Sequence, residues 1–337
     1  MTKSNEPPSI LRVDDLHVSF RTDDAMVQAV RGVSFEIGAG ETLGVVGESG
    51  SGKSVTNLAL MGLIPMPPGV IEHGTAMFDG RDLLTMPERD MQRIRGRRIG
   101  MIFQDPMTAL NPLMTVGDQL TEATRWHLAL DRHHAQSRAV EMLGMVGIAS
   151  PEDRLRQYPH QFSGGMRQRV MIAMALSCEP DLLIADEPTT ALDVTIQAQI
   201  LELLQAIQKR RSISIVLITH DLGIVASVCN RVLVMYAGRI VESATTEDLF
   251  ASPAHPYTRG LLASLPRLDD DSHQLLRSIP GTPPDMGNPP IGCAFRARCE
   301  LAINACASED PRLLPFREHH DAACLVTTGT ASAEASS

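Results

Sequence analysis

The chain has 337 residues, 43% apolar and 21% charged, which is typical of a folded protein with a buried core. Its 30 Lys and Arg against 40 Asp and Glu give a formal net charge of −10, which disfavours nucleic-acid binding by bulk electrostatics. No apolar run reaches the ~18 residues of a membrane-spanning helix, and the polar start has no signal-peptide layout. We therefore expect a cytosolic protein that reaches a membrane only through a partner.

The first part of the chain is rich in strand signals. Alternating or β-rich runs over residues 11–46 are broken by turn residues at 23–24 and 38–40. A short apolar strand at 43–46 leads directly into a glycine-rich loop. The elements predicted to follow are a helix over 54–63 and strands at 75–78 and 99–103.

The middle of the chain alternates between helical and strand patterns. Apolar residues at helical spacing from Ile196 to Ile207 predict one amphipathic helix. Alternating strands and helices predict an α/β fold with a parallel sheet. The elements predicted here are helical segments over 115–146 and 164–176, and strands at 182–185, 213–218 and 232–235.

The composition changes after about residue 252. Residues 253–292 are dense in proline and predict an extended connector that is neither sheet nor helix bundle. The stretch 327–337 is rich in Ala, Ser, Thr and Gly, which predicts disorder. Residues 1–10 are expected to be a flexible N-terminus.

The sequence GESGSGKS fits the phosphate-loop pattern G-x-x-x-x-G-K-[ST], and it lies between a predicted strand and a predicted helix. Backbone N–H groups of such a loop surround phosphate oxygens, and the helix N-terminus adds partial positive charge. Lys53 is expected to reach the β- and γ-phosphates, and the Ser54 hydroxyl to ligate Mg²⁺. A glycine-rich turn with a chance lysine is the alternative. The predicted nucleotide-binding residues of this loop are Gly47, Glu48, Ser49, Gly50, Ser51, Gly52, Lys53 and Ser54.

The second motif is LLIADE, an apolar run followed by two acidic residues that ends at Glu187. Its apolar strand delivers Asp186 to the magnesium ion, and Glu187 can polarise the attacking water. Two solvated acids at a strand end are the alternative, which the phosphate loop in the same chain disfavours.

The segment FSGGMR places Ser163, Gly164 and Gly165 at the start of a predicted helix. Such a helix start is a second anion-binding element. Because one nucleotide needs one phosphate loop, we expect these residues to serve a nucleotide held by another subunit. A plain helix N-cap is the alternative.

Together these motifs resemble those of ATP-binding cassette (ABC) ATPases over residues 11–250. The resemblance implies a P-loop (RecA-like) α/β cassette with antiparallel β and helical subdomains, the helical one at about 105–178. It implies that Gln104 touches Mg²⁺ and senses a membrane partner, and that Asp193 lies in the D-loop that begins at Ala191. It also implies that His220 contacts the γ-phosphate, and that Phe20 stacks on adenine unless it is a core residue. Asp221 is expected to cap the helix after His220.

Longer stretches resemble the oligopeptide/dipeptide importer branch of that family. They are MIFQDPMTALNP, the region around the signature, HPYTRGLL and the Cys-bearing tail. The resemblance implies two transmembrane permease subunits, an extracytoplasmic binding protein and a place on the cytoplasmic face of the inner membrane. Met166 replaces the usual signature glutamine, which favours a heterodimer with a paralogous ATPase over a homodimer.

The region 253–326 is predicted to be a C-terminal extension that carries four cysteines, spaced C-x5-C-x6-C-x17-C. No C-x2-C knuckle is present, whereas iron–sulfur clusters accept varied spacings, and some relatives in this branch carry a cluster. We therefore predict a [4Fe–4S] cluster, with Zn²⁺ or packed thiols as alternatives. The neighbouring His319 and His320 are expected at the surface, and Cys178 and Cys229 in the core. The predicted cluster ligands are Cys293, Cys299, Cys306 and Cys324.

The predicted function is ATP hydrolysis that powers import of di- or oligopeptides, within an assembly that binds no nucleic acid. Lys53, Gln104, Glu187 and His220 are the predicted catalytic residues, with ATP and Mg²⁺ as ligands. Nickel, glutathione or another small solute is the alternative cargo. A soluble ABC ATPase of DNA repair or translation is disfavoured, because the chain lacks coiled-coil or zinc inserts, a second cassette and a basic balance.

Overall fold

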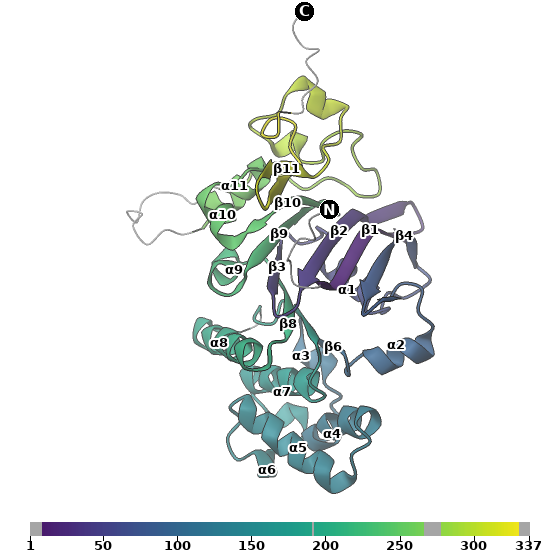
Figure 1. Ribbon diagram of the computed structural model, residues 1–337, viewed down its shortest axis with the longest axis vertical. Helices are drawn as coiled ribbons and strands as arrows, with labels where there is room; N and C mark the ends of the chain where they lie inside the picture. Colours follow the sequence, from purple (N-terminus) through teal and green to yellow (C-terminus); the bar gives the residue numbers. More distant parts are fainter. Residues whose placement is uncertain (1–8, 191, 266–277, 330–337) are drawn as a thin grey trace, which may run out of the picture. The chain divides into compact units, whose positions relative to one another are not determined.

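The structure, a computed structural model, describes residues 9–190, 192–265 and 278–329, which divide into two units (Figure 1). The first unit comprises residues 9–10, 37–42 and 85–218, and the second comprises residues 11–36, 43–84 and 219–329. Of the predicted flexible start 1–10, only Ser9 and Ile10 are described, and they belong to a strand. The predicted disordered tail lies outside the described residues from 330 onward.

The first unit contains three parallel strands: β6 (Ile99–Ile102), β7 (Leu182–Asp186) and β8 (Ser214–Thr219). Leu182 lies opposite both Ile99 and Ser214 in the register. Every residue of β7 and β8 is buried, as expected for a parallel sheet covered on both faces. The predicted strands at 99–103, 182–185 and 213–218 are confirmed.

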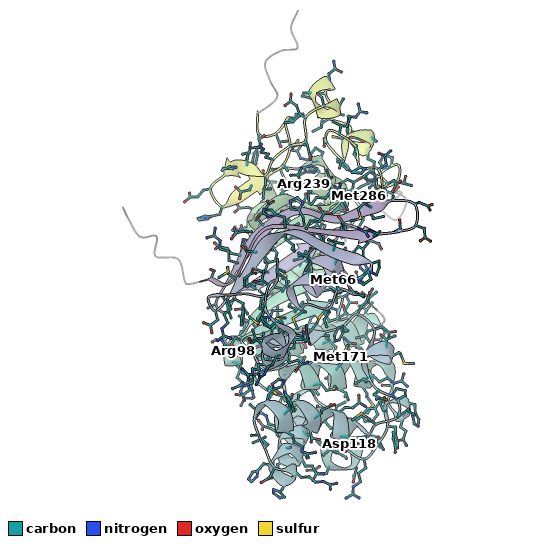
Figure 2. All side chains as sticks on the ribbon, turned by 90° about the vertical axis from the view of Figure 1, so that its right-hand side faces the viewer. Met66, Arg98, Asp118, Met171, Arg239 and Met286 are labelled. Atoms are coloured by element: carbon teal, nitrogen blue, oxygen red, sulfur yellow. The ribbon has the colours of Figure 1, made fainter. Side chains whose placement is uncertain are left out.

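The first unit also contains most of the helices of the cassette, and the predicted helical stretch 115–146 is two helices. Thr115 caps the first and Asp131 the second, each accepting a hydrogen bond from a backbone N–H near the helix start. Asp118 in α4 and Met171 in α7 mark this region in Figure 2. The helices are α2 (Glu88–Ile94), α3 (Pro106–Ala109), α4 (Val116–His127), α5 (Arg132–Met145), α6 (Pro151–Arg154), α7 (Gly164–Leu176), α8 (Val194–Arg211) and the 3₁₀ helix η1 (Pro159–Gln161).

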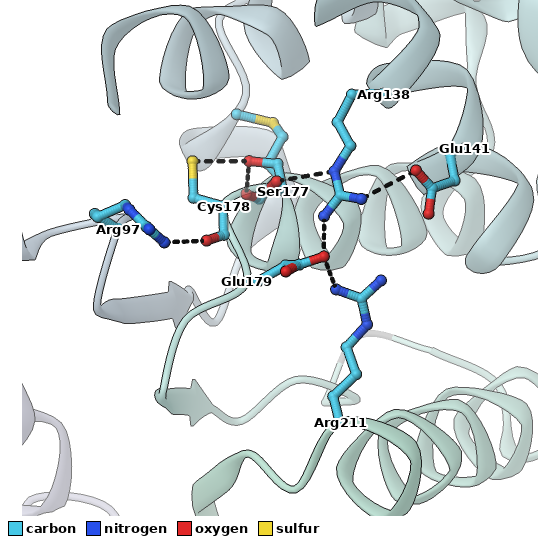
Figure 3. Close-up of polar contacts among 8 residues, drawn as sticks. Arg97, Arg138, Glu141, Ser177, Cys178, Glu179 and Arg211 are labelled. Atoms are coloured by element: carbon cyan, nitrogen blue, oxygen red, sulfur yellow. Dashed lines mark hydrogen bonds and ion pairs between the residues drawn. The ribbon is translucent and has the colours of Figure 1, made fainter. Parts of the chain in front are cut away.

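A polar cluster links helices α5 and α8 through Glu179, which lies in the segment after α7 (Figure 3). Its Oε1 accepts hydrogen bonds of 2.6 Å from Arg138 of α5 and 2.6 Å from Arg211 at the end of α8. Arg138 also donates to Glu141 on its own helix, at 3.0 Å. The hydrogen bond from Arg138 lowers the pKa of Glu179. Cys178, next to this cluster, is buried as predicted.

The second unit contains an antiparallel sheet ordered β2-β1-β4-β5. Its strands are β1 (Ser9–Arg21), β2 (Met26–Gly38), β4 (Gly69–Phe78) and β5 (Arg81–Asp82). In the same unit β3 (Thr42–Val46) pairs in parallel with β9 (Arg231–Tyr236), and both are apolar and mostly buried. The predicted strands in these segments are confirmed. Helix α1 (Lys53–Leu60) ends three residues before the predicted bound, and α9 (Leu222–Val228) starts from Asp221, which caps it as expected.

The C-terminal part of the second unit departs most from the prediction. Strand β10 (Arg239–Thr245) pairs with β9 and with β12 (His320–Ala322), which pairs in turn with β11 (Leu314–Arg317). Between them lie α10 (Thr246–Ala251), α11 (Pro256–Ala263) and the 3₁₀ helices η2 (Arg296–Arg298) and η3 (Asn304–Ala307). The expectation of a purely extended connector over 253–292 is wrong, because α11 lies within it, with His255 as its cap.

The core of the second unit includes side chains from this C-terminal part. Phe295 lies in one cluster with β9 and α11 residues, and its ring is 5.3 Å from that of Tyr236 and 5.5 Å from that of Tyr257. Figure 2 marks Arg239 and Met286 in this part of the chain. None of the helices in the described ranges combines the length and apolarity that a bilayer crossing requires.

Candidate functional site

The phosphate-loop residues connect β3 to α1, as the motif requires. Gly47 passes so close to β9 that a Cβ there would lie 2.2 Å from the carbonyl oxygen of Met235. Gly52 has φ of 100°, and a Cβ there would lie 2.5 Å from the carbonyl oxygen of Ala29. Both positions therefore exclude side chains. Glycine at these positions allows the loop the tight backbone conformation in which N–H groups can bind an anion.

Lys53 is buried within this loop, at 5% exposure. Its Nζ donates hydrogen bonds to the carbonyl oxygens of Gly47 (2.7 Å) and Glu48 (2.9 Å). The ammonium group is thus held against the backbone of the loop, and it adds positive charge there. Ser54 follows within the first turn of α1.

In the first unit, β7 ends at Asp186, which is buried, and Glu187 follows with φ of 46°. One carboxylate oxygen of Glu187 accepts hydrogen bonds from Gln104 Nε2 (3.0 Å) and from Thr190 Oγ1 (2.8 Å). Its N–H donates to the carbonyl of Ile218, at 3.0 Å. The structure therefore brings two predicted site residues, Gln104 and Glu187, into direct contact.

The three residues predicted to hold Mg²⁺ fit the ion by donor chemistry. Ser54, Gln104 and Asp186 offer hydroxyl, amide and carboxylate oxygens, the donors that Mg²⁺ prefers. Asp186 and Gln104 belong to the first unit, and Ser54 belongs to the second.

The signature residues lie at the start of α7. Ser163 caps the helix by accepting from the N–H of Met166 at 3.3 Å, so the N-cap alternative is structurally correct. A surface hollow of about 640 Å³ is lined by Ser163, Gly164 and Gly165 together with Asp193. Asp193 caps α8 through the N–H of Ile196. The first unit therefore brings the predicted signature and D-loop residues to one hollow; Ala191 lies outside the described residues.

Two further predicted residues lie in the second unit. His220 is exposed and lies between the end of β8 and the start of α9. Phe20 is half-buried near the end of β1, opposite Gly69 in the register.

Comparisons with known proteins decide the family. Residues 30–190 match the ABC transporter model, and residues 241–306 match the model of the oligopeptide/dipeptide transporter C-terminal region. The oligopeptide transport ATP-binding protein OppD of Bacillus subtilis is 56% identical over 311 residues, covering 92% of this chain and 87% of the relative. The chain belongs to the ATP-binding subunits of ABC transporters.

Other relatives and solved structures agree with this ABC ATPase assignment. The dipeptide transport ATP-binding protein DppD of Bacillus subtilis is 55% identical over 315 residues, covering 94% of both chains. The ATP-binding cassette MJ0796, in a dimeric post-hydrolysis state bound to ADP and Pi, superposes with a TM-score of 0.64 at 25% identity. That match covers 70% of this chain and 98% of MJ0796. The predicted fold class and ATPase activity are confirmed.

The predicted iron–sulfur cluster is wrong. No group of three or more His, Cys, Asp or Glu side chains is placed to hold a metal ion within the described ranges, which include all four tail cysteines. Burial raises the pKa of the Cys293 thiol to about 11 and also raises that of Cys299. The zinc alternative has no ligand group among these residues either, and the relatives are named for oligopeptide and dipeptide transport.

Of the two tail histidines expected at the surface, His319 is exposed, but the expectation for His320 is wrong. His320 is 1% exposed, and its Nε2 lies 2.7 Å from Oε1 of the fully buried Glu242. Pairing of β12 with β10 places the two side chains together, so the histidine is a packing residue with a hydrogen-bond partner. Cys229 is only partly buried and lies at the C-terminal cap of α9.

Sequence reasoning missed three residues that contact the site. Thr190 binds Glu187 from three residues away, a spacing at which a hydroxyl can bond back across a turn. Tyr257 and Arg298 contact the phosphate loop from more than 200 residues away. No local pattern in the sequence signals such distant contacts.

Proposed function

We propose that this ABC ATPase powers the import of di- or oligopeptides across the cytoplasmic membrane. The hydrogen-bonded pair of Gln104 and Glu187, directly after the buried Asp186, supports the hydrolytic part. The match of residues 241–306 to the oligopeptide/dipeptide transporter region, and relatives named for peptide transport, support the cargo class.

In this proposal the phosphate loop and Lys53 bind the triphosphate by backbone N–H groups and by charge. Glu187 accepts a proton from the attacking water, and Gln104 orients that carboxylate. Mg²⁺ bound with ATP would offset charge on the phosphates, and Ser54, Gln104 and Asp186 are the residues that would hold it. Positioning and electrostatics supply most of the rate enhancement.

The remaining predicted residues act at the edges of the nucleotide. His220 contacts the γ-phosphate, and Phe20 contacts the base. Ser163, Gly164, Gly165 and Asp193 serve a nucleotide held by a second ATPase subunit, a paralogue. The assembly further includes two permease subunits and an extracytoplasmic binding protein, and the chain works at the inner face of the membrane.

The test is solute uptake by proteoliposomes that contain the chain with the permease and ATPase subunits encoded beside it. With the binding protein and a labelled oligopeptide outside, ATP trapped inside should drive accumulation, and a non-hydrolysable ATP analogue should not. Labelled nickel and glutathione serve as competing solutes. Accumulation of either one without peptide accumulation would contradict the peptide assignment and leave the ATPase assignment intact.

A further inference from the structure

Glu48, the second residue of the phosphate loop, is held on two sides by residues from the C-terminal part of the chain. Its carboxylate accepts two hydrogen bonds from Arg298, Nη1 to Oε2 at 2.8 Å and Nη2 to Oε1 at 2.9 Å. Its backbone N–H donates to the hydroxyl of Tyr257 at 2.8 Å. All three residues belong to the second unit.

Arg298 is itself fixed in place. It is 8% exposed, and its Nε donates to the carbonyl of Pro280 at 3.0 Å. Its guanidinium carbon lies 5.8 Å from the centre of the Tyr236 ring and 5.9 Å from that of the Phe295 ring. A planar guanidinium that is stacked on rings and paired through two parallel bonds loses little further entropy when it holds a carboxylate.

Tyr257 is equally fixed. Its side chain is fully buried, and its ring centre lies 4.6 Å from that of Tyr236 and 5.5 Å from that of Phe295. The hydroxyl therefore presents a stationary acceptor to the loop. The Glu48 N–H donates to this hydroxyl, so its direction is fixed by Tyr257.

A carboxylate in a loop that binds a triphosphate raises an electrostatic problem. At a few ångströms to about 10 Å, like charges at a protein surface repel appreciably, and a bidentate cation on the carboxylate removes most of that repulsion. Arg298 lies within hydrogen-bond distance of both Glu48 oxygens.

We propose that Arg298 and Tyr257 are positioning residues for ATP: Arg298 neutralises Glu48, and Tyr257 fixes the direction of its N–H. The C-terminal extension is then part of the nucleotide site of its own subunit. This role rests on ATP binding alone and not on the transported solute, so failure of peptide uptake would leave it standing.

The test is the affinity of the purified full-length chain for a fluorescent ATP analogue, with Mg²⁺ present. Arg298→Met should weaken binding about tenfold. Arg296→Met is the matched control, because Arg296 is exposed on the same 3₁₀ turn, and it should bind as the unchanged chain does. Tyr257→Phe, which keeps the ring and removes the hydroxyl, should weaken binding about threefold.

The decisive variant is the double substitution Glu48→Gln with Arg298→Met. It removes the uncompensated charge, so it should restore affinity to within about threefold of the unchanged chain. A role for Arg298 in packing alone would leave the double variant as weak as Arg298→Met, and that result would overturn the proposal, as would equal binding by Arg298→Met and Arg296→Met.

Melting curves establish whether each variant is folded. If Arg298→Met does not fold, Glu48→Gln alone supplies the test from the other partner. It leaves the positive charge of Arg298 unopposed, so it should bind the analogue about threefold more tightly. Unchanged or weaker binding by folded Glu48→Gln would then overturn the proposal.

Discussion

Glu187 and Glu48 are both acidic residues in loops of the ATPase machinery, but their partners come from different distances along the chain. Glu187 is held by Thr190, three residues on, and by Gln104, both within the first unit. Glu48 is held by Tyr257 and Arg298, 209 and 250 residues away. The loop of Glu187 is thus held by residues of the cassette, and the loop of Glu48 by residues of the C-terminal extension.

From this difference we infer separate kinetic roles for the two parts of the chain. In the proposed mechanism Glu187 takes a proton from the attacking water, so a change in its contacts should affect turnover. Contacts around Glu48 act on the shape and charge of the phosphate loop, so they should affect ATP affinity. The extension contributes no predicted catalytic group. It affects the reaction through the affinity of the phosphate loop for ATP.

The largest expected effect is the loss of turnover in Glu187→Gln. The amide keeps the size of the side chain but cannot accept a proton, so kcat should fall about a thousandfold. Steady-state ATP hydrolysis measures the loss, and a filter-binding assay should show that ATP affinity stays within about twofold. Full turnover by this variant would remove Glu187 as the base.

The next effect tests how the extension is attached. Glu242 is fully buried and accepts hydrogen bonds from the N–H of Ala254, the N–H of His255 and Nε2 of His320. Glu242→Ala leaves these donors without an acceptor, which should cost about 3 kcal/mol of unfolding free energy. Urea unfolding measures it, with Glu318→Ala as the control because that side chain is 92% exposed. If Glu242→Ala lowers the free energy of unfolding no more than Glu318→Ala does, the hydrogen bonds of Glu242 do not stabilise the attachment of the extension to β10.

A third effect concerns pH. Burial lowers the pKa of His255 to about 3, whereas an unfolded histidine titrates near ~6.5. Below about pH 6.5 this histidine is protonated in the unfolded chain but not in the folded chain. The free energy of unfolding therefore falls as the pH drops towards the pKa of the folded state. This residue should account for about 2 kcal/mol of the loss between pH 7 and pH 5.

The check on His255 is the variant His255→Asn, whose amide oxygen can replace Nδ1 as the acceptor for the N–H of Tyr257. Urea unfolding at both pH values should show a smaller loss for the variant than for the unchanged chain. Equal losses would mean that His255 does not titrate between the two states.

The smallest effect lies in the first unit. Glu179 is 56% exposed, so removing its ion pairs with Arg138 and Arg211 in Glu179→Ala should cost only about 0.5–1 kcal/mol. The folded-state pKa is lowered, so the contribution is present above the ordinary Glu pKa and fades as pH falls through the lowered one. Thermal melts in low salt and in 1 M salt measure it, and a difference that does not shrink with salt would argue against an ionic origin.

The cassette was largely predictable from local patterns. The apolar runs at 182–185 and 213–218 became β7 and β8, and the Ser163 turn became the cap of α7. These features depend on residues within one turn or one strand. The phosphate loop was identifiable for the same reason, since its pattern is local and two of its glycines, Gly47 and Gly52, lie against backbone atoms that admit no side chain.

The extension was poorly predicted because its structure depends on distant partners. Short strands such as β12 have no periodicity of their own, and β12 forms between β10 and β11. The density of cysteines suggested a metal centre, but the fold gives them no common ligand geometry within the described ranges. His320 was expected at the surface because its buried partner, Glu242, lies 78 residues earlier in the chain and no local pattern indicates the contact.

The most direct test of the division between turnover and affinity is steady-state ATP hydrolysis by the assembled transporter, with Glu187→Gln and Arg298→Met measured side by side. Glu187→Gln should lose kcat, with ATP affinity unchanged. Arg298→Met should raise KM for ATP about tenfold and keep kcat within about twofold. A loss of kcat in Arg298→Met at unchanged KM would contradict the assignment of the C-terminal extension to nucleotide binding.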